Sequence, residues 1–380
     1  MRALCLLALP IAAFGQGVPL HVTLELIAPS LPDSTTVFVA GSLPQLGNWN
    51  PGAVRLTPRG DHVWRLNLVL DRTVSFEYKY TLGTWEREAA DAAGAPTRNL
   101  AARPAADTTI TTTVGRWTDR ARQRVLNGQV TGTLRYHRGV AGAGVAARDV
   151  VVWLPPGYEQ SGRTRYPVLY MLDGQNVFDP ATSSFGTDWA VDEAADSLIR
   201  ARAILPLIVV GVYNSPQRNA EYLPGSVARA HMEFMLRVVK PLVDSVYRTK
   251  RDAQSTYVGG SSAGGMAAFM LAWEHPDVFS RALAFSPAFQ APAGSELQFD
   301  YVPNVLHTSQ PPRHVRFYVD VGGVGLEARL RPGVEAMVNA LKSRGYREGL
   351  DVRLVRAPDA EHNELAWRAR FPAALVWIMR

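Results

Sequence analysis

Residues 256–273 read TYVGGSSAGGMAAFMLAW, and this stretch decides the fold of the larger part of the chain. A β-branched and aromatic run ends at Val258, residues 260–264 match G-x-S-x-G, and a run of helix-forming residues follows. A strand, a tight turn of small residues and a helix together expose the central serine at the end of a sheet, beside a helix N-terminus that favours negative charge. The pattern predicts that Ser262 is a nucleophile; the alternative is a purely structural strand-to-helix turn.

The residues around this stretch repeat the alternation of strands and helices. Near-continuous apolar runs suit strands that are buried on both faces of a sheet, and their alternation with helical stretches predicts a mostly parallel sheet with helices on both sides. The apolar runs lie at 150–154, 168–172, 207–212, 256–258, 282–285 and 315–319, and the helical candidates include 231–247 and 263–274.

A serine needs a base, and in this architecture the chain order is serine, acid, histidine. His362 lies in the sequence DAEHNE between a predicted strand at 352–355 and a predicted terminal helix at 365–379, which makes it the candidate base. Glu327 follows the strand at 315–319 and is the favoured acid. Asp320 at the strand end is the open alternative, and Glu361 and Asp359 are weaker ones.

The tetrahedral intermediate that forms when a serine attacks an acyl carbon needs backbone N–H donors. The amide of Ala263, directly after the serine, is one candidate. The second is the amide of Gln175, with Gly174 next, in the loop that follows the strand at 168–172. The alternative is an ordinary Asp-Gly turn at this position.

The first part of the chain has a different pattern. Residues 18–116 contain short runs of alternating apolar residues between turn clusters, which predicts an all-β sandwich of immunoglobulin-like type. Residues 117–127 are polar and charged and are interpreted as a linker to a second domain at 128–380. Because this linker is polar and the two patterns belong to unrelated folds, we expect the two halves to work independently.

Residues 1–15 read MRALCLLALPIAAFG and have the charged start, apolar core and small residues of a signal peptide. The expected location is therefore secreted or periplasmic. The single cysteine, Cys5, lies in this segment, so cysteine catalysis and cysteine metal sites are excluded for the mature chain.

The composition narrows the possible partners. Charged residues are 19% of the 380, and the net charge of +6 comes from scattered arginines, so a disordered chain and a nucleic-acid partner are not expected. No later stretch is long enough for a membrane helix, and no metal or cofactor is implied. The oligomeric state stays open.

The second domain resembles an esterase family of the α/β-hydrolases that includes feruloyl and acetyl-xylan esterases, enterochelin-type esterases and esterase D. The resemblance implies a Ser-acid-His triad of Ser262, Glu327 and His362. The loop at 322–327 is longer than the usual Asp-x-Gly segment of the family, which keeps the choice of acid open. The motifs that carry the resemblance are 155–158 (PPGY), 170–178 (YMLDGQNVF), 247–249 (YRT), 259–265 (GGSSAGG) and 361–367 (EHNELAW).

The first domain resembles a starch-binding carbohydrate module of the family-20 type, through 37–49 (VFVAGSLPQLGNW), 76–80 (FEYKY) and 83–86 (GTWE). The resemblance implies that Trp49 and Trp85 form a stacking platform for sugar rings. It also implies hydrogen bonds to sugar hydroxyls from Lys79, Glu86 and Asn99. The alternative is that both tryptophans belong to the core of the sandwich.

These features together predict a secreted serine esterase that binds starch or a related α-glucan and cleaves acyl or feruloyl esters of carbohydrates. Two alternatives remain open. One is a siderophore esterase of the enterochelin type, and the other is a carbohydrate-binding protein whose hydrolase domain is not catalytic.

Overall fold

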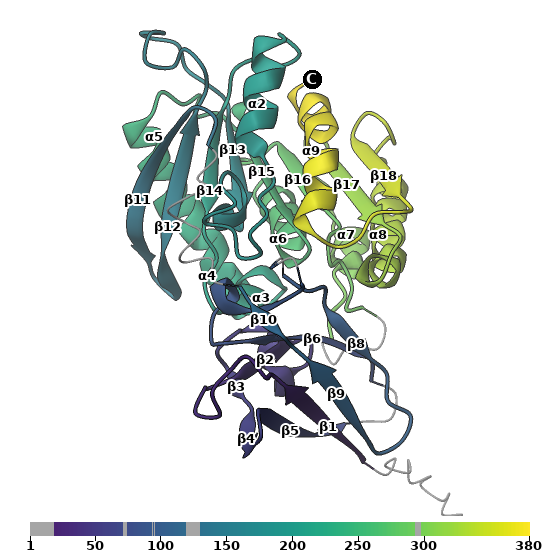
Figure 1. The fold of residues 1–380 in the computed structure, drawn as a ribbon. Helices are drawn as coiled ribbons and strands as arrows, with labels where there is room; N and C mark the ends of the chain where they lie inside the picture. Colours follow the sequence, from purple (N-terminus) through teal and green to yellow (C-terminus); the bar gives the residue numbers. More distant parts are fainter. Residues whose placement is uncertain (1–18, 71–73, 93, 95, 119–129, 293–297) are drawn as a thin grey trace, which may run out of the picture.

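The computed structural model describes residues 19–70, 74–92, 94, 96–118, 130–292 and 298–380. The predicted signal peptide at 1–15 and most of the predicted linker at 117–127 lie outside these residues. Figure 1 shows two domains, a smaller strand-rich one and a larger one built of strands and helices.

The smaller domain is a sandwich of two four-stranded sheets, with strand orders β4-β5-β1-β9 and β3-β2-β6-β8. Alternate residues of β1 face the core, as period-2 patterning requires, and Trp64 of β5 is fully buried between the sheets. The strands are β1 (Leu20–Ile27), β2 (Phe38–Gly41), β3 (Val54–Arg55), β4 (Thr57–Gly60), β5 (Val63–Leu70), β6 (Phe76–Thr81), β7 (Ala89–Ala90), β8 (Leu100–Ala102), β9 (Thr108–Thr113) and β10 (Arg116–Trp117).

The assignment of Trp117 to the linker is corrected by the structure. Arg116 and Trp117 form β10, which pairs antiparallel with β7, and Trp117 packs against the core of the sandwich. Trp117 is an apolar residue in a polar stretch of sequence, and its ring is partly buried against the sandwich. The small domain therefore extends to the end of β10.

The larger domain is built on one eight-stranded sheet in the order β11-β12-β14-β13-β15-β16-β17-β18. The sheet is mixed, because β12 pairs antiparallel with both β11 and β14. The remaining strands, β14, β13, β15, β16, β17 and β18, all pair in parallel with their neighbours. The strands are β11 (Thr133–Gly142), β12 (Val145–Leu154), β13 (Val168–Leu172), β14 (Ile208–Val212), β15 (Thr256–Ser261), β16 (Arg281–Phe285), β17 (Arg316–Gly322) and β18 (Val352–Ala357).

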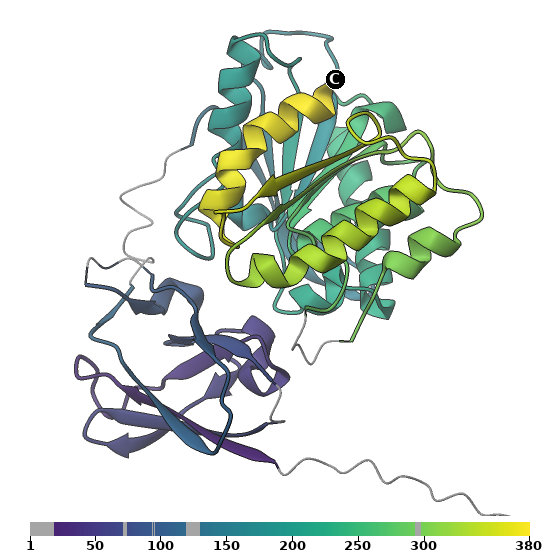
Figure 2. The ribbon, with the colours of Figure 1, turned by 90° about the vertical axis from the view of Figure 1, so that its right-hand side faces the viewer.

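Helices cover both faces of this sheet. Helices α2 and α9 pack on one face, and α4 to α8 pack on the other. In Figure 2 the yellow α9 and the yellow-green α8 accordingly lie on opposite sides of the last strands. The helices are α2 (Val191–Arg200), α3 (Arg218–Tyr222), α4 (Ser226–Phe234), α5 (Lys240–Val246), α6 (Ala263–Glu274), α7 (Val302–His307), α8 (Leu326–Ser343) and α9 (Glu364–Met379), with a π-helical turn at Met235–Val239 between α4 and α5. Among the described residues, no helix combines the length and the apolar character that crossing a bilayer requires.

A buried ion pair ties β12 to α3. Arg148 donates two hydrogen bonds, of 2.6 and 2.8 Å, to the carboxylate of Glu221, and both side chains are almost fully buried. This pair fixes α3 against the sheet, and α3 carries Arg218, which holds a loop of the candidate site.

We predict that Arg148→Leu destabilises the protein by about 3–5 kcal/mol, because the substitution leaves the carboxylate of Glu221 buried without its counter-charge. Guanidinium unfolding followed by tryptophan fluorescence measures the change. The double variant Arg148→Leu/Glu221→Leu should recover most of the loss, since neither charge then remains. Equal stability of the single variant and the wild type would contradict the assignment.

Candidate active site

Ser262 lies at the turn between β15 and α6 with φ 57° and ψ −124°. This left-handed conformation is strained for a residue with a side chain and requires a close approach of the flanking backbone. A Cβ atom on Gly260 would lie 2.7 Å from the carbonyl oxygen of Gly264, and one on Gly265 would lie 2.9 Å from that of Phe285. The glycines of the GSSAGG stretch are therefore what allow the serine to take its place.

The backbone around Ser262 is held on both sides. Its N–H donates to the carbonyl oxygen of Phe285 at 2.9 Å, and its carbonyl accepts from Met266 in α6 at 3.0 Å and from Ala288 at 3.2 Å. The side chain is half-buried. The hydroxyl is thus presented at the carboxyl edge of the parallel strands, where ligands bind in open α/β sheets.

The structure brings His362 and Glu327 together. Nδ1 of His362 lies 3.1 Å from Oε1 of Glu327, whose other oxygen accepts from the N–H of Gly322 at 2.7 Å. Burial alone would raise the pKa of Glu327, but the hydrogen bond and charge of His362, together with Ser286 and the Gly322 N–H, lower it below its usual range. A carboxylate on Nδ1 makes that nitrogen the donor and leaves Nε2 free to accept a proton.

The ring of His362 is also held by Trp367 of α9. The two rings meet edge to face with centroids 4.9 Å apart, and the indole N–H of Trp367 donates to Ser286 at 3.0 Å. Among the described residues, no hydrogen bond joins the hydroxyl of Ser262 to His362. Such bonds are often long in unliganded enzymes and shorten when substrate binds.

Asp320 has different partners from Glu327. Its carboxylate accepts from Arg370 of α9 at 2.7 and 3.2 Å and from the N–H of Ser286 at 2.8 Å, and it is fully buried. Burial raises its pKa, and the charge of Arg370 opposes that rise. Asp320 therefore anchors α9 and the residues after β16, while Glu327 is the acid that contacts His362.

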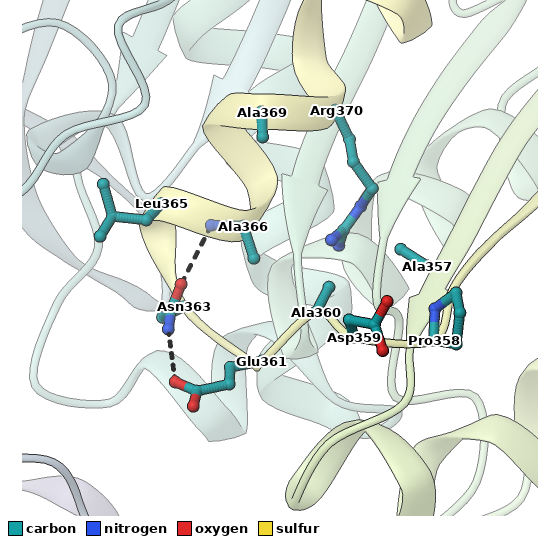
Figure 3. Close-up of a pocket in the computed structure, with 10 residues that line it drawn as sticks. All are labelled: Ala357, Pro358, Asp359, Ala360, Glu361, Asn363, Leu365, Ala366, Ala369 and Arg370. Carbon is teal, nitrogen blue, oxygen red and sulfur yellow. Dashed lines mark hydrogen bonds between the residues drawn. The ribbon is translucent and has the colours of Figure 1, made fainter.

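The other two candidate acids, Asp359 and Glu361, lie in the segment that precedes α9. Figure 3 shows the pocket that this segment lines; its lining does not include Ser262. There Nδ2 of Asn363 donates to Glu361 at 3.2 Å, and Oδ1 of Asn363 caps α9 by accepting from Ala366 at 3.0 Å. No hydrogen bond joins Glu361 or Asp359 to His362 within the described residues.

The predicted oxyanion donors lie in two short segments. Gln175 belongs to the 3₁₀ turn Gly174–Asn176 after β13. A Cβ atom on Gly174 would lie 2.3 Å from the carbonyl carbon of Gly211, so the turn can approach β14 only with a glycine there. Within the described part of the chain, the backbone N–H groups of Gln175 and Ala263 have no hydrogen-bond partner, which leaves both available to a substrate oxygen.

The turn Gly174–Asn176 carries the predicted donor of Gln175 and is called the oxyanion turn below. A charged network that the sequence did not reveal holds this turn in place. Arg218 of α3 donates to both carboxylate oxygens of Asp173, at 2.6 and 2.7 Å, and to the carbonyl of Ser261 at 3.3 Å. Asn214 adds a hydrogen bond of 2.7 Å to Asp173. Arg218 thereby links the oxyanion turn to the serine turn. The sequence held one indication of this role, because Arg218 follows the predicted strand at 207–212 and therefore comes at the same edge of the sheet.

Glu364 lies in the same region and is buried. The amide of Asn176 donates to it at 3.4 Å. Burial raises the pKa of Glu364 to about 7, with a further rise from Asp173 and opposing effects from Arg218 and Lys79. The folded protein therefore keeps a proton on this carboxyl to higher pH than the unfolded chain does.

One group of carboxylates could in principle hold a cation, namely Asp188, Asp192 and Glu193, whose ligand atoms lie within 4.8 Å of one another. Burial first, and the adjoining Glu193 second, raise the pKa of Asp192. Asp192 also accepts from the N–H of Thr131 at 2.7 Å. Oδ1 of Asp192 and Oε2 of Glu193 are buried and accept no hydrogen bond within the described residues.

Two of the predicted sugar-binding residues, Trp85 and Lys79, contact Phe185 of the large domain. Figure 1 shows the small domain lying against the large one. The rings of Trp49 and Trp85 have centroids 6.4 Å apart and are tilted by 37°. Both are half-buried and lie outside the core cluster. Trp85 packs against Phe185 of the large domain at 5.6 Å.

Lys79 and Asn99 are engaged with protein partners. The ammonium of Lys79 is buried and forms an ion pair of 2.5 Å with Glu88, rather than pointing into solvent as a hydroxyl donor would. A buried cation needs a paired anion, which explains the difference. The exposed Asn99 donates to Glu77 at 3.2 Å. The side chain of Glu86 lies outside the described residues.

The two halves were expected to work independently, but charged residues on the surfaces of the two domains pair with one another. Arg329 of α8 donates to Glu77 at 3.1 Å, and Arg98 forms an ion pair of 3.4 Å with Glu361. The polar linker carried no information about which faces of the two folds meet.

We predict that Glu364→Gln stabilises the protein increasingly as pH rises from about 5 to 8. The wild-type carboxyl keeps its proton to about pH 7 when folded but releases it near 4.5 when unfolded, so its ionisation costs stability across this window. The gain reaches at most about 3 kcal/mol. Thermal melts of both proteins at pH 5 and pH 8 measure it, and a melting difference that does not change with pH would contradict the raised pKa. Gln keeps the acceptor for Asn176.

Comparison with known proteins gives a consistent picture. Residues 146–378 match the family described as "Putative esterase", and residues 19–104 match the family described as "Starch binding domain". Over 230 residues the chain is 27% identical to an endo-1,4-beta-xylanase/feruloyl esterase of Xylanibacter ruminicola, which covers 57% of this chain and 27% of that protein. It is 27% identical over 192 residues to an iron(III) salmochelin esterase of Escherichia coli, covering 47% of this chain and 43% of that one.

Solved structures share the fold. An enterochelin esterase of Shigella flexneri matches with a TM-score of 0.55 and 15% identity, covering 91% of this chain and 88% of that one. A ferulic acid esterase matches with a TM-score of 0.54 and 21% identity, covering 65% of this chain and 98% of that one. The chain spans 36% of the length of a Corynebacterium glutamicum relative and 27% of the Xylanibacter ruminicola enzyme. Because the family model spans well over half of its residues, the chain belongs to the esterase family of α/β-hydrolases and carries a starch-binding-type module in front of it.

Proposed function

We propose that this protein is a serine carboxylic-ester hydrolase that acts on acyl or feruloyl esters of carbohydrates, with its N-terminal module binding an α-glucan. The observation that carries the proposal is the pairing of His362 with the buried Glu327 at the sheet edge where Ser262 takes its strained turn. Chain order and residue type fit the Ser-acid-His arrangement of this fold.

The proposed reaction proceeds through an acyl-enzyme. The hydroxyl of Ser262 attacks the ester carbonyl carbon while Nε2 of His362 takes its proton, and the N–H groups of Ala263 and Gln175 receive the negative charge that develops on the carbonyl oxygen. His362 then gives the proton to the departing alcohol oxygen. A water molecule, activated by the same imidazole, releases the acid and restores the serine. Glu327 holds the Nδ1–H tautomer and stabilises the imidazolium throughout.

The ion pairs around the site support this chemistry. Arg218 fixes the oxyanion turn through Asp173, and the Asp320–Arg370 pair fixes the start of α9 beside His362. A preorganised donor pair needs such supports, because donors that must reorganise during the reaction stabilise the transition state less.

A siderophore ester is the second candidate substrate. It is favoured by the 27% identity with an iron(III) salmochelin esterase over 192 residues. A soluble siderophore has no use for a starch-binding-type module, so the carbohydrate ester remains the first proposal. Comparing kcat/KM for an acetylated maltotriose, a feruloylated sugar and a cyclic catecholate trilactone distinguishes the carbohydrate ester from the siderophore ester as substrate.

We also propose that the protein is exported, on the basis of the signal-peptide pattern at 1–15. Mass spectrometry of the mature protein tests this, because cleavage near Gly15 removes the segment that contains Cys5.

We predict that Ser262→Ala lowers hydrolysis of p-nitrophenyl acetate by at least about 10⁴-fold, because the acyl-enzyme can no longer form. The melting temperature should stay close to that of the wild type, since the turn keeps its glycines. A purified variant that retains wild-type turnover would overturn the assignment of the nucleophile. A wild-type protein without esterase activity would favour a non-catalytic binding role.

We predict different losses for the two buried acids. Glu327→Gln should lower kcat by roughly 10³–10⁴-fold with a modest change in melting temperature, because the imidazole loses its orienting carboxylate. Asp320→Asn should chiefly lower the melting temperature, because Arg370 then lacks its buried counter-charge. A larger loss of kcat in Asp320→Asn than in Glu327→Gln, at equal melting temperatures, would exchange the two roles.

A further inference from the structure

The face of the small domain that carries the predicted sugar-binding residues is in contact with the large domain. Trp85 and Lys79 both approach Phe185, with Trp85 at 5.6 Å between ring centroids and the ammonium of Lys79 at 5.9 Å from the ring. Glu77, on the same strand as Lys79, accepts from Arg329 at 3.1 Å. A module that tethers an enzyme to starch granules would need this face free, and it is not.

The contacted segments of the large domain are those that carry the proposed active site. Arg329 follows Glu327 by two residues on α8, and Glu361, which pairs with Arg98, adjoins His362. Phe185 follows Ser184, whose hydroxyl accepts from the side chain of Gln175 at 3.4 Å. The N–H of Ser184 also donates to Asn176 at 2.8 Å. One face of the module thus meets the acid, base and oxyanion segments together.

Trp49, Trp85 and Phe185 form an aromatic group that spans the two domains. Adjacent members have ring centroids 6.4 and 5.6 Å apart, and all three residues are half-buried. The core indole of Trp64 is fully buried by comparison. Rings that keep exposed surface beside a site of ester chemistry can stack on the apolar C–H face of a sugar.

The charge of the module also reaches the oxyanion region. Lys79, buried against Glu88, is among the groups that lower the pKa of Glu364, which contacts Asn176 of the oxyanion turn. The two domains therefore interact electrostatically as well as through their aromatic rings.

We propose that Trp49, Trp85 and Phe185 form a composite subsite that binds the sugar part of the ester whose acyl group is transferred to Ser262. The substrate class is a soluble acylated α-gluco-oligosaccharide held by both domains at once, in place of a granule bound by a free module. This inference rests on the proposed esterase function and assigns Phe185, a residue of the esterase domain, to sugar binding.

The decisive variant is Phe185→Ala, because Phe185 lies outside the module. Isothermal titration of the full chain with maltotriose should show a Kd about tenfold weaker for Phe185→Ala and for Trp85→Ala, since each loses a stacking ring. The ratio of kcat/KM for an acetylated maltotriose to that for p-nitrophenyl acetate should fall by a similar factor in both. Trp85→Phe, which keeps a ring, should recover most of the ratio and guards against an effect of misfolding.

Two exposed residues away from this face provide matched controls. Val69→Ala in β5 and Leu205→Ala between α2 and β14 each shorten an exposed apolar side chain, and they should keep the wild-type Kd and ratio. If Phe185→Ala binds maltotriose like the wild type and keeps the ratio, while Ser262 remains essential, the composite subsite is wrong and the module acts alone. If the wild type does not bind maltotriose, or if Ser262→Ala stays active, the proposed function itself has failed and the inference falls with it.

Discussion

The strained backbone of Ser262 is the constraint on which the rest of this structure depends. The combination of φ 57° and ψ −124° is strained for a residue with a side chain, and here β15, α6 and the carbonyl of Phe285 hold it in place together. The close backbone contacts of Gly260 and Gly265 leave no room for a Cβ atom at either position. The sheet, with strands buried on both faces, supplies the rigidity that keeps the turn in place.

Around that turn, ion pairs with buried carboxylates do the positioning that apolar packing cannot do. Arg218 with Asp173 holds the oxyanion turn, and Arg370 with Asp320 holds α9 beside the imidazole. The first pair joins the loop after β13 to α3, and the second joins β17 to α9, so the loop and α9 gain rigidity from the elements to which they are tied. Buried charges are stable only in such pairs, which makes these links specific in partner and in geometry.

The small domain takes part in this arrangement instead of standing apart from it. The face with its predicted sugar-binding residues lies against segments adjoining Gln175, Glu327 and His362. A domain held in this way can limit access to the serine and contribute contacts to the alcohol part of an ester. Specificity for the sugar would then arise at the contact between two folds, neither of which contains the whole subsite.

Local patterns in the sequence were enough to predict much of the molecule. The G-x-S-x-G turn, the apolar runs of the sheet and the alternation in β1 depend on residues that are neighbours along the chain. His362 could be proposed from chain order and from its loop before α9. The antiparallel pairing of β12 and the place of Trp117 in β10 were not apparent, because strand direction and edge pairing depend on which segments meet in space.

Only the tertiary structure decided which acid faces His362. Glu327 and Asp320 are both carboxylic acids and are seven residues apart in the chain, but Glu327 in the first turn of α8 faces the imidazole, whereas Asp320 in β17 faces Arg370. Tertiary structure also placed Phe185 against Trp85 and Arg329 against Glu77. These contacts join residues about 100 and 252 positions apart. The sequence alone determined the fold class and the serine turn because short-range sterics and periodicity govern them, whereas long-range pairing of charges and rings depends on how two independently patterned domains pack.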